Sequence, residues 1–134
     1  MKKNKVCLVT GGFDPVHSGH IEYLKKGKEI SDYLIVGLNS DEWLTRKKGY
    51  AFMPWNERKN ILINMEIVDE VLAFDDSDDS ACNAIEKSLN ISGKVIFANG
   101  GDRGKDNIPE LIKFKDNPDV DFIFGVGGSN KMNS

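Results

Sequence analysis

The chain has 134 residues, a length that suits one compact domain, and its apolar content of 40% is enough to build a core and excludes a disordered protein. Charged residues make up 29% and the formal net charge is −3, without the basic excess typical of nucleic-acid-binding proteins. We therefore expect no nucleic-acid partner, and we expect any anionic ligand to be held by local donors rather than by a general positive field.

The basic first residues precede an apolar run that is too short for a signal peptide or a membrane span. The two cysteines, Cys7 and Cys82, lie in an apolar run and in an expected helix, and are interpreted as buried free thiols of a reducing compartment. We therefore expect a cytoplasmic protein with no membrane contact.

Short apolar runs and longer amphipathic stretches alternate along the chain. A strand is predicted over 6–9, a helix over 17–30, a second strand over 33–38 and a short helix capped at Ser40 and running through Leu44. A polar, glycine-containing loop is expected over 46–52, followed by a helix that Pro54 opens and that runs through Met65. The remaining expected elements are a strand over 71–74, a helix that the acidic turn 75–79 begins and that reaches Leu89, a strand over 94–98, a loop over 99–108, a short helix opened by Pro109 and a strand over 121–124.

Such near-continuously apolar strands, alternating with helices, predict a parallel sheet covered by helices on both faces. In open sheets of this kind the ligand lies outside the carboxyl ends of the strands. The two glycine-rich segments, at 11–12 and 100–101, each follow a strand. Both are therefore expected at that edge.

The turn after the first strand carries the strongest chemical signal. Gly11 and Gly12 let the backbone approach a ligand closely, and the following helix begins near His17, where free N–H groups and the helix dipole favour an anion. His17 and His20 are three residues apart, on one face of that helix end, and imidazole N–H groups can bind phosphate oxygens. Gly19 between them adds no side chain. A helix cap or a metal pair is the alternative, but no third ligand lies at a suitable spacing, so we predict a phosphate site.

The segment Gly-Phe-Asp-Pro-Val-His-Ser-Gly-His at 12–20 resembles the GxFDxxHxGH motif of the cytidylyltransferase-like nucleotidyltransferases. Segments 38–41, 46–49, 56–58 and 100–102 resemble the same family, so the likeness covers nearly the whole chain. It implies a Rossmann-like three-layer α/β/α fold with a five-stranded parallel sheet of order 3-2-1-4-5, a magnesium–NTP substrate and a homodimer. Segments 39–41 and 100–102 look more like heptose-1-phosphate adenylyltransferases, and the rest is shared with glycerol-3-phosphate cytidylyltransferases.

The resemblance also implies roles for individual residues. It implies a catalytic set that holds phosphates through the transition state: His17, His20, Lys47, Lys48 and Arg58. It implies a nucleotide-binding set in the two glycine-rich segments and near the C-terminus: Gly11, Gly12, Phe13, Asp14, Gly19, Gly100, Asp102 and Ser129. No residue is predicted as a metal ligand. The choice between Lys47 and Lys48 stays open, as do a solvated basic loop at 46–48 and an exposed, carboxylate-paired Arg58.

Other polar and aromatic residues have plainer interpretations. Asp14 is expected to fix the turn by local hydrogen bonds, because an ionised acceptor phosphate needs no base. The aspartates at 75, 76, 78 and 79 are expected to cap a helix and meet solvent. The aromatic residues at 43, 50, 52 and 55 are expected to pack locally, with one of them lining an acceptor pocket.

The C-terminal segment departs from the family. A Ser/Thr-rich start of a last helix is matched only loosely, by Ser129 within 127–134. Either the domain over 1–134 lacks the last helix of the family or its site is closed differently. We predict an enzyme that joins the NMP part of CTP or ATP to a small phosphorylated acceptor and releases pyrophosphate by in-line attack. A non-catalytic nucleotide-binding module derived from this family is the alternative.

Overall fold

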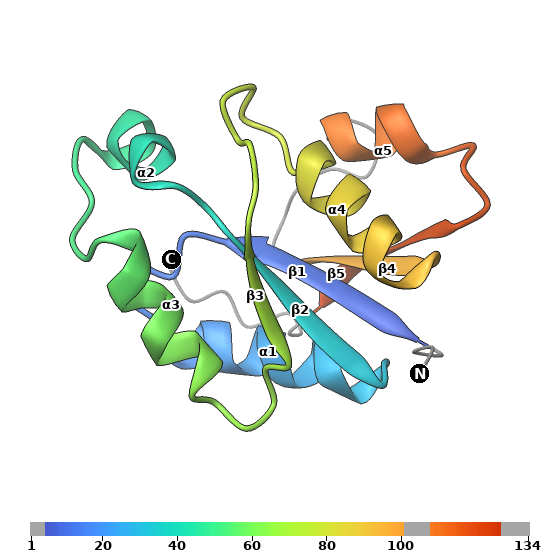
Figure 1. Ribbon diagram of the computed structural model, residues 1–134, viewed down its shortest axis with the longest axis horizontal. Helices are drawn as coiled ribbons and strands as arrows, with labels where there is room; N and C mark the ends of the chain where they lie inside the picture. Colours follow the sequence, from blue (N-terminus) through green and yellow to red (C-terminus); the bar gives the residue numbers. More distant parts are fainter. Residues whose placement is uncertain (1–4, 101–107, 127–134) are drawn as a thin grey trace.

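Five parallel strands form a single sheet in the order β3-β2-β1-β4-β5, flanked by helices (Figure 1). The computed structural model describes residues 5–100 and 108–126. The strands are β1 (Val6–Gly11), β2 (Tyr33–Leu38), β3 (Glu70–Ala73), β4 (Val95–Gly100) and β5 (Val120–Val126). The predicted α/β class and the strand order 3-2-1-4-5 are confirmed.

Helices cover both faces of the sheet. Helices α1 (Ser18–Glu29) and α3 (Trp55–Ile63) lie on one face, and α4 (Cys82–Ser92) and α5 (Pro109–Phe114) on the other (Figure 1). The short helix α2 (Asp41–Lys48) follows the carboxyl end of β2. None of the helices in the described part of the chain has the length and apolarity needed to cross a bilayer.

Side chains of the central strands alternate between two buried clusters. In β1, Val6 and Leu8 pack with α4 and α5, whereas Cys7 and Val9 pack on the α1 side. Each fully buried aliphatic side chain contributes about 1.5–3 kcal/mol. Both cysteines are free and buried, as predicted, and burial raises the pKa of Cys7 to about 12, so its thiol stays protonated and inert.

Helices α2 and α4 have boundaries that differ from the sequence-based expectation by more than two residues. Helix α2 continues to Lys48, so the prediction of a loop from residue 46 onward is wrong. The Ser40 hydroxyl accepts the Trp43 N–H and so caps the start of α2. Basic residues in the last turn stabilise the negative end of the helix dipole, and the helix ends at Gly49, whose φ of 89° is left-handed. Helix α4 begins only at Cys82 because serines at 77 and 80 donate to the preceding aspartates and hold residues 75–80 in turns.

Strand pairing marks where a ligand can enter. Strands β1 and β2 pair along their whole length, up to Gly11 opposite Leu38. Strands β1 and β4 pair only at Cys7 and Leu8, so the carboxyl ends of these two strands are not joined by a ladder. The strand order reverses between β1 and β4, which is the usual ligand position in such sheets.

Candidate active site

The two histidines form the start of α1. His17 is the N-cap, and its Nδ1 accepts the Gly19 N–H at 3.1 Å. The Nδ1 of His20 accepts the backbone N–H of His17, also at 3.1 Å, so the pair forms a reciprocal capping box made of imidazoles. The two rings stack with their centroids 3.8 Å apart. The helix-cap role that the sequence offered as an alternative is therefore present, and it leaves Nε2 of both rings outside the capping bonds. The phosphate site stays a prediction.

The capping bonds fix the proton positions of both rings. A nitrogen that accepts a backbone N–H carries no proton, so each neutral ring holds its proton on Nε2. Burial, reinforced by the neighbouring His17, lowers the pKa of His20 from 6.5 to about 4, so His20 is neutral near pH 7. Each ring is thus prepared as an Nε2–H donor.

The Nε2 of His17 is buried and has no hydrogen-bond partner in the part of the chain that the structure describes. Such a group costs about 1–3 kcal/mol unless something binds it. Next to it, Phe13 has a left-handed backbone with φ 50°, and its buried ring packs 4.8 Å from the His20 ring. Backbone strain and an unpaired donor together are typical of a binding site rather than of a merely structural turn.

The Asp14 carboxylate connects this turn to the segment after α2. It accepts the backbone N–H groups of Phe52 at 2.6 Å and Met53 at 2.7 Å, and it pairs with the Lys48 ammonium at 3.0 Å. Burial acts to raise the pKa of Asp14, but the hydrogen bonds from Lys48, Phe52 and Met53 outweigh it and hold that pKa below its usual range. The expected loop-fixing role of Asp14 agrees with these contacts.

The two candidate lysines lie in different places. Lys48 donates to the Asp14 carbonyl at 2.8 Å. Its ammonium therefore lies at the turn over residues 11–17, which we call the phosphate turn after the site predicted there. Lys47 is exposed, with its ammonium 5.6 Å from the centre of the Trp43 ring. The geometry therefore separates two residues that the sequence could not.

Arg58 is fully buried, so the interpretation of an exposed helix residue is wrong. Its guanidinium donates to the carbonyls of Gly12 at 2.9 Å, Asn39 at 2.8 Å and Met53 at 2.9 Å, and it pairs with Asp41. One side chain thus ties the phosphate turn to the start of α2 and the start of α3. A direct contact between Arg58 and phosphate stays a prediction.

The glycines of the turn have a packing role as well. A Cβ at Gly12 would lie 2.8 Å from a Leu44 methyl of α2, so the missing side chain lets the turn and α2 approach each other. Gly11 ends β1, Gly19 donates its N–H to the cap, and Gly100 is the last residue of β4 rather than part of a loop. Predicted residues Asp102 and Ser129 lie outside the described residues.

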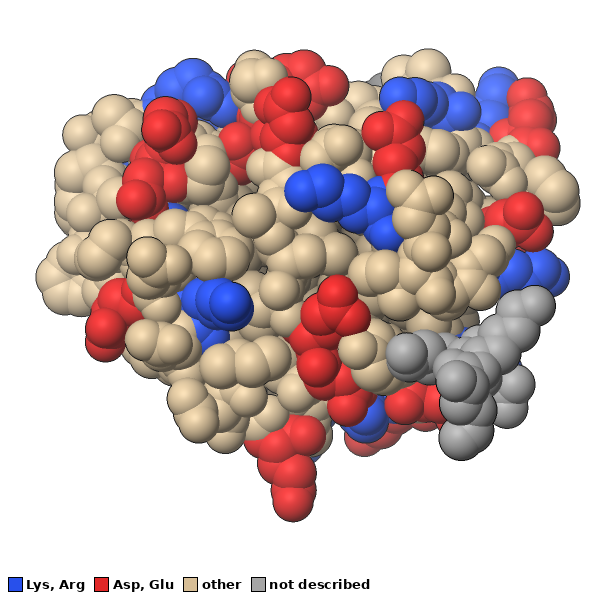
Figure 2. Space-filling view, in the orientation of Figure 1, with Lys and Arg blue, Asp and Glu red and all other residues tan. Residues whose placement is uncertain are grey.

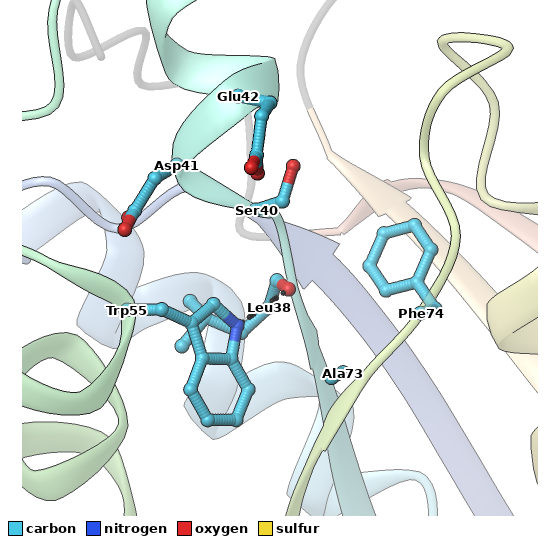
Figure 3. A pocket seen from close by; sticks show the side chains of 7 residues that line it. All are labelled: Leu38, Ser40, Asp41, Glu42, Trp55, Ala73 and Phe74. Carbon is cyan, nitrogen blue, oxygen red and sulfur yellow. Dashed lines mark hydrogen bonds between the residues drawn. The ribbon is translucent and has the colours of Figure 1, made fainter.

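A pocket of about 230 Å³ lies at the carboxyl ends of β2 and β3, next to the starts of α2 and α3. Figure 3 shows Asp41 and Glu42 of α2 on one side of it and the Trp55 indole below them, and the lining is Leu38, Ser40, Asp41, Glu42, Trp55, Ala73 and Phe74. The indole N–H donates to the Leu38 carbonyl at 3.1 Å, which fixes the ring plane. Carboxylates at the rim and an aromatic floor suit a ligand that has both hydroxyl groups and C–H faces.

Sequence reasoning missed one residue close to this site, the buried Asp76. It was expected to meet solvent, yet only 4% of it is exposed, and it accepts hydrogen bonds from Asn39 and Ser40. Its neighbours in the sequence resemble it in type and are exposed, so no local pattern distinguishes it. The expectation that these aspartates cap α4 is also wrong, because the N-cap of that helix is Ala81, whose backbone N–H donates to the Glu110 carboxylate at 2.5 Å.

Charge is mixed around the site. Figure 2 shows acidic and basic side chains interspersed on this face, including the edge where α2 and the turn before α4 lie. Among the described residues, no group of three or more His, Cys, Asp or Glu side chains could hold a metal ion. An anionic ligand at this edge would be held by individual donors rather than by a general positive field.

The fold is a Rossmann-like α/β type with strand order 3-2-1-4-5, and it carries the histidine turn between β1 and α1. Residues 8–119 match the cytidylyltransferase-like family, and the chain belongs to that family. It is 36% identical over 126 residues to the bifunctional protein HldE of Campylobacter concisus, which covers 92% of this chain and 25% of that protein. It is 39% identical over 113 residues to the HldE protein of Wolinella succinogenes, which covers 81% of this chain and 23% of that protein.

The chain thus spans about a quarter of the length of the curated relatives that it matches. Among solved structures, the lipopolysaccharide core biosynthesis protein from Thermoplasma volcanium superposes with a TM-score of 0.74 at 22% identity, covering 94% of this chain and 98% of that one. This likeness shows the shared fold.

Proposed function

We propose that this domain transfers the NMP part of an NTP to the phosphate of a small phosphorylated acceptor, with a sugar phosphate as the acceptor class. The observation that carries the proposal is the histidine pair: both Nδ1 atoms accept backbone N–H groups, and the buried Nε2 of His17 has no hydrogen-bond partner among residues 5–100 and 108–126. Two Nε2–H donors at a helix N-terminus suit the oxygens of a polyphosphate.

The proposed reaction needs no protein nucleophile. An oxygen of the acceptor phosphate attacks the α-phosphorus of magnesium–NTP, a new P–O bond forms, and the bond to the β-phosphate oxygen breaks to release magnesium pyrophosphate. His17 and His20 donate to phosphate oxygens on which negative charge increases, and they lose no proton. The magnesium ion enters and leaves with the nucleotide and its product.

We assign the bridging cation to Lys48. Its ammonium lies at the phosphate turn and is partly neutralised by Asp14, so an arriving phosphate can share it without a large movement of α2. Arg58 acts behind it by holding the Gly12 carbonyl. The homodimer, the magnesium requirement and the choice of CTP or ATP stay predictions.

The pocket at the carboxyl ends of β2 and β3 is proposed to receive the body of the acceptor. Arg58 donates to both Gly12 and Asp41, so the pocket carboxylate and the phosphate turn meet on one guanidinium. Hydroxyl groups can donate to Asp41 and Glu42 while a sugar face packs on Trp55. The matched HldE proteins and the sequence resemblance to heptose-1-phosphate adenylyltransferases support the sugar-phosphate class.

A coupled pyrophosphate-release assay tests this function. The protein is incubated with magnesium and ATP or CTP, together with hexose 1-phosphate, heptose 1-phosphate or glycerol 3-phosphate, and products are identified by mass spectrometry. We expect a sugar nucleotide and pyrophosphate in equal amounts. Nucleotide binding by calorimetry without product from any acceptor would instead support the non-catalytic module.

A further inference from the structure

The four aspartates of the acidic loop, residues 75–80, divide into two pairs. Asp75 and Asp78 act locally, because each accepts the N–H and hydroxyl of the serine two residues later. Asp76 and Asp79 instead reach across to α2, more than thirty residues earlier in the chain. Only the second pair can influence the transfer site.

Asp76 holds the beginning of α2. Its Oδ2 accepts the Asn39 side-chain N–H at 3.0 Å and the Ser40 backbone N–H at 2.8 Å, and its Oδ1 accepts the Ser40 hydroxyl at 2.7 Å. Bonds to an ionised acceptor are about twice as strong as neutral ones, and here they are shielded from water. The N-cap of α2 is thereby attached to a second loop.

Arg46 holds the end of the same helix. Its Nη2 donates to the Asp76 carbonyl at 2.8 Å and to the Asp79 carboxylate at 3.0 Å. The acidic loop therefore contacts α2 at both ends. Two residues after Arg46, the last residue of α2 is Lys48, whose ammonium meets Asp14 in the phosphate turn.

We propose that Asp76 is a positioning residue of the transfer site: with Arg46, it fixes the orientation of α2 and so the place of the Lys48 ammonium. This inference rests on the proposed function for the role of Lys48, but the clamp itself can be measured without turnover. Asp76 also fixes Asn39, whose carbonyl accepts from Arg58 beside Gly12. The same carboxylate therefore supports both sides of the phosphate turn.

The test compares Asp76→Asn with Asp75→Asn. Both remove one charge from the acidic loop, but asparagine at 75 keeps the oxygen that its local turn needs, whereas at 76 an N–H₂ group replaces an acceptor oxygen. Lysines are labelled briefly with an acetylating reagent, and the Lys48 to Lys47 labelling ratio is read by mass spectrometry. We expect the ratio to rise several-fold in Asp76→Asn and to stay unchanged in Asp75→Asn. An unchanged ratio in both variants would overturn the proposal.

Turnover gives the second readout. We expect Asp76→Asn to lower kcat by about 10–100-fold, the scale found for residues that orient functional groups, and Asp75→Asn to leave it unchanged. In a Lys48→Met background the same Asp76 change should cost far less, because its effect acts through Lys48. Equal losses in both backgrounds would contradict positioning through that lysine.

A second variant serves if Asp76→Asn does not fold, as judged by circular dichroism. Arg46→Met releases the other end of α2 at an exposed position, and the proposal requires the same rise in the Lys48 to Lys47 labelling ratio. If the unmodified protein releases no pyrophosphate with any acceptor, the proposed function fails, while the labelling ratio still decides whether the clamp exists.

Discussion

At the scale of single residues, the site depends on how two imidazoles are oriented. A histidine N-cap is unusual, since oxygen side chains serve this position better. Here the capping bonds occupy Nδ1 of both His17 and His20 and leave Nε2 for a ligand. Helix stability and ligand binding thus use opposite nitrogens of the same rings, so they can be separated by substitution.

His17→Asn should separate cap from chemistry. The asparagine oxygen can accept the Gly19 N–H, so the free energy of unfolding should change by less than about 1 kcal/mol. The Nε2–H donor is lost, so kcat should fall by about 100-fold or more. Urea unfolding and the pyrophosphate assay measure the two effects. Near-normal turnover would remove His17 from the reaction.

His20 predicts a particular pH dependence of stability. Its pKa is lowered in the folded state to about 4 from an ordinary 6.5, so below pH 6.5 the unfolded chain binds the proton first. The free energy of unfolding therefore keeps its full value above pH 6.5, and protonation of this group in the unfolded chain lowers it by about 2–3 kcal/mol as the pH falls toward 4. His20→Gln keeps a capping side chain that does not titrate.

Urea unfolding of the unmodified protein and of His20→Gln at pH 7 and pH 4.5 measures this term, because all other titrating groups are shared. We expect the unmodified protein to lose more unfolding free energy between pH 7 and pH 4.5 than His20→Gln does. Parallel losses in the two proteins would show that His20 is not the source.

At the scale of elements, α2 is the piece that brings charge to the site. Ser40 begins it and Gly49 ends it, and only the last of its basic residues reaches the phosphate turn. Successive residues of a helix point about 100° apart, and here the Lys48 ammonium lies at Asp14 while the Lys47 ammonium lies over the Trp43 ring. The packing of α2 against Gly12 and the acidic loop therefore decides which lysine lies at the phosphate turn.

Lys48→Ala and Lys47→Ala form a matched pair for this element. We expect Lys48→Ala to lower kcat/KM by about 100-fold, as for a lost transition-state contact. Lys47→Ala should cost less than about 5-fold, since an exposed charge contributes little. The coupled assay measures both. Equal losses, or a larger loss for Lys47, would reverse the assignment.

At the scale of the whole molecule, Arg58 joins parts of the chain that the sequence keeps far apart. Its partners lie in the turn after β1, at the end of β2, in α2 and before α3. The planar guanidinium satisfies all of these oxygens at once, which a lysine could not do. The site edge of the sheet is therefore organised around one buried cation.

Arg58→Met should lower the free energy of unfolding by about 3–5 kcal/mol, because it leaves three carbonyls and a carboxylate without their donor. Lys59→Met, the neighbouring change on α3, removes a contact with the Trp55 ring and should cost below about 1 kcal/mol. Urea unfolding compares the two variants. A small effect at Arg58 would mean that water can replace the guanidinium.

The sequence by itself determined the sheet, because continuous apolar strands alternating with helices have few solutions, and it determined the histidine turn, because glycines, motif and helix start are contiguous. It also indicated Asp14 as a residue that fixes the turn. These features depend on neighbours along the chain, which pattern and propensity describe well.

Only the tertiary structure decided that Lys48 rather than Lys47 meets the turn, that Arg58 is buried, and that Asp76 differs from the aspartates beside it. Each of these outcomes depends on contacts between segments that lie 19 to 46 residues apart in the chain. Burial of a charged side chain requires partners from several elements at once, and residue type and spacing do not specify which elements will meet.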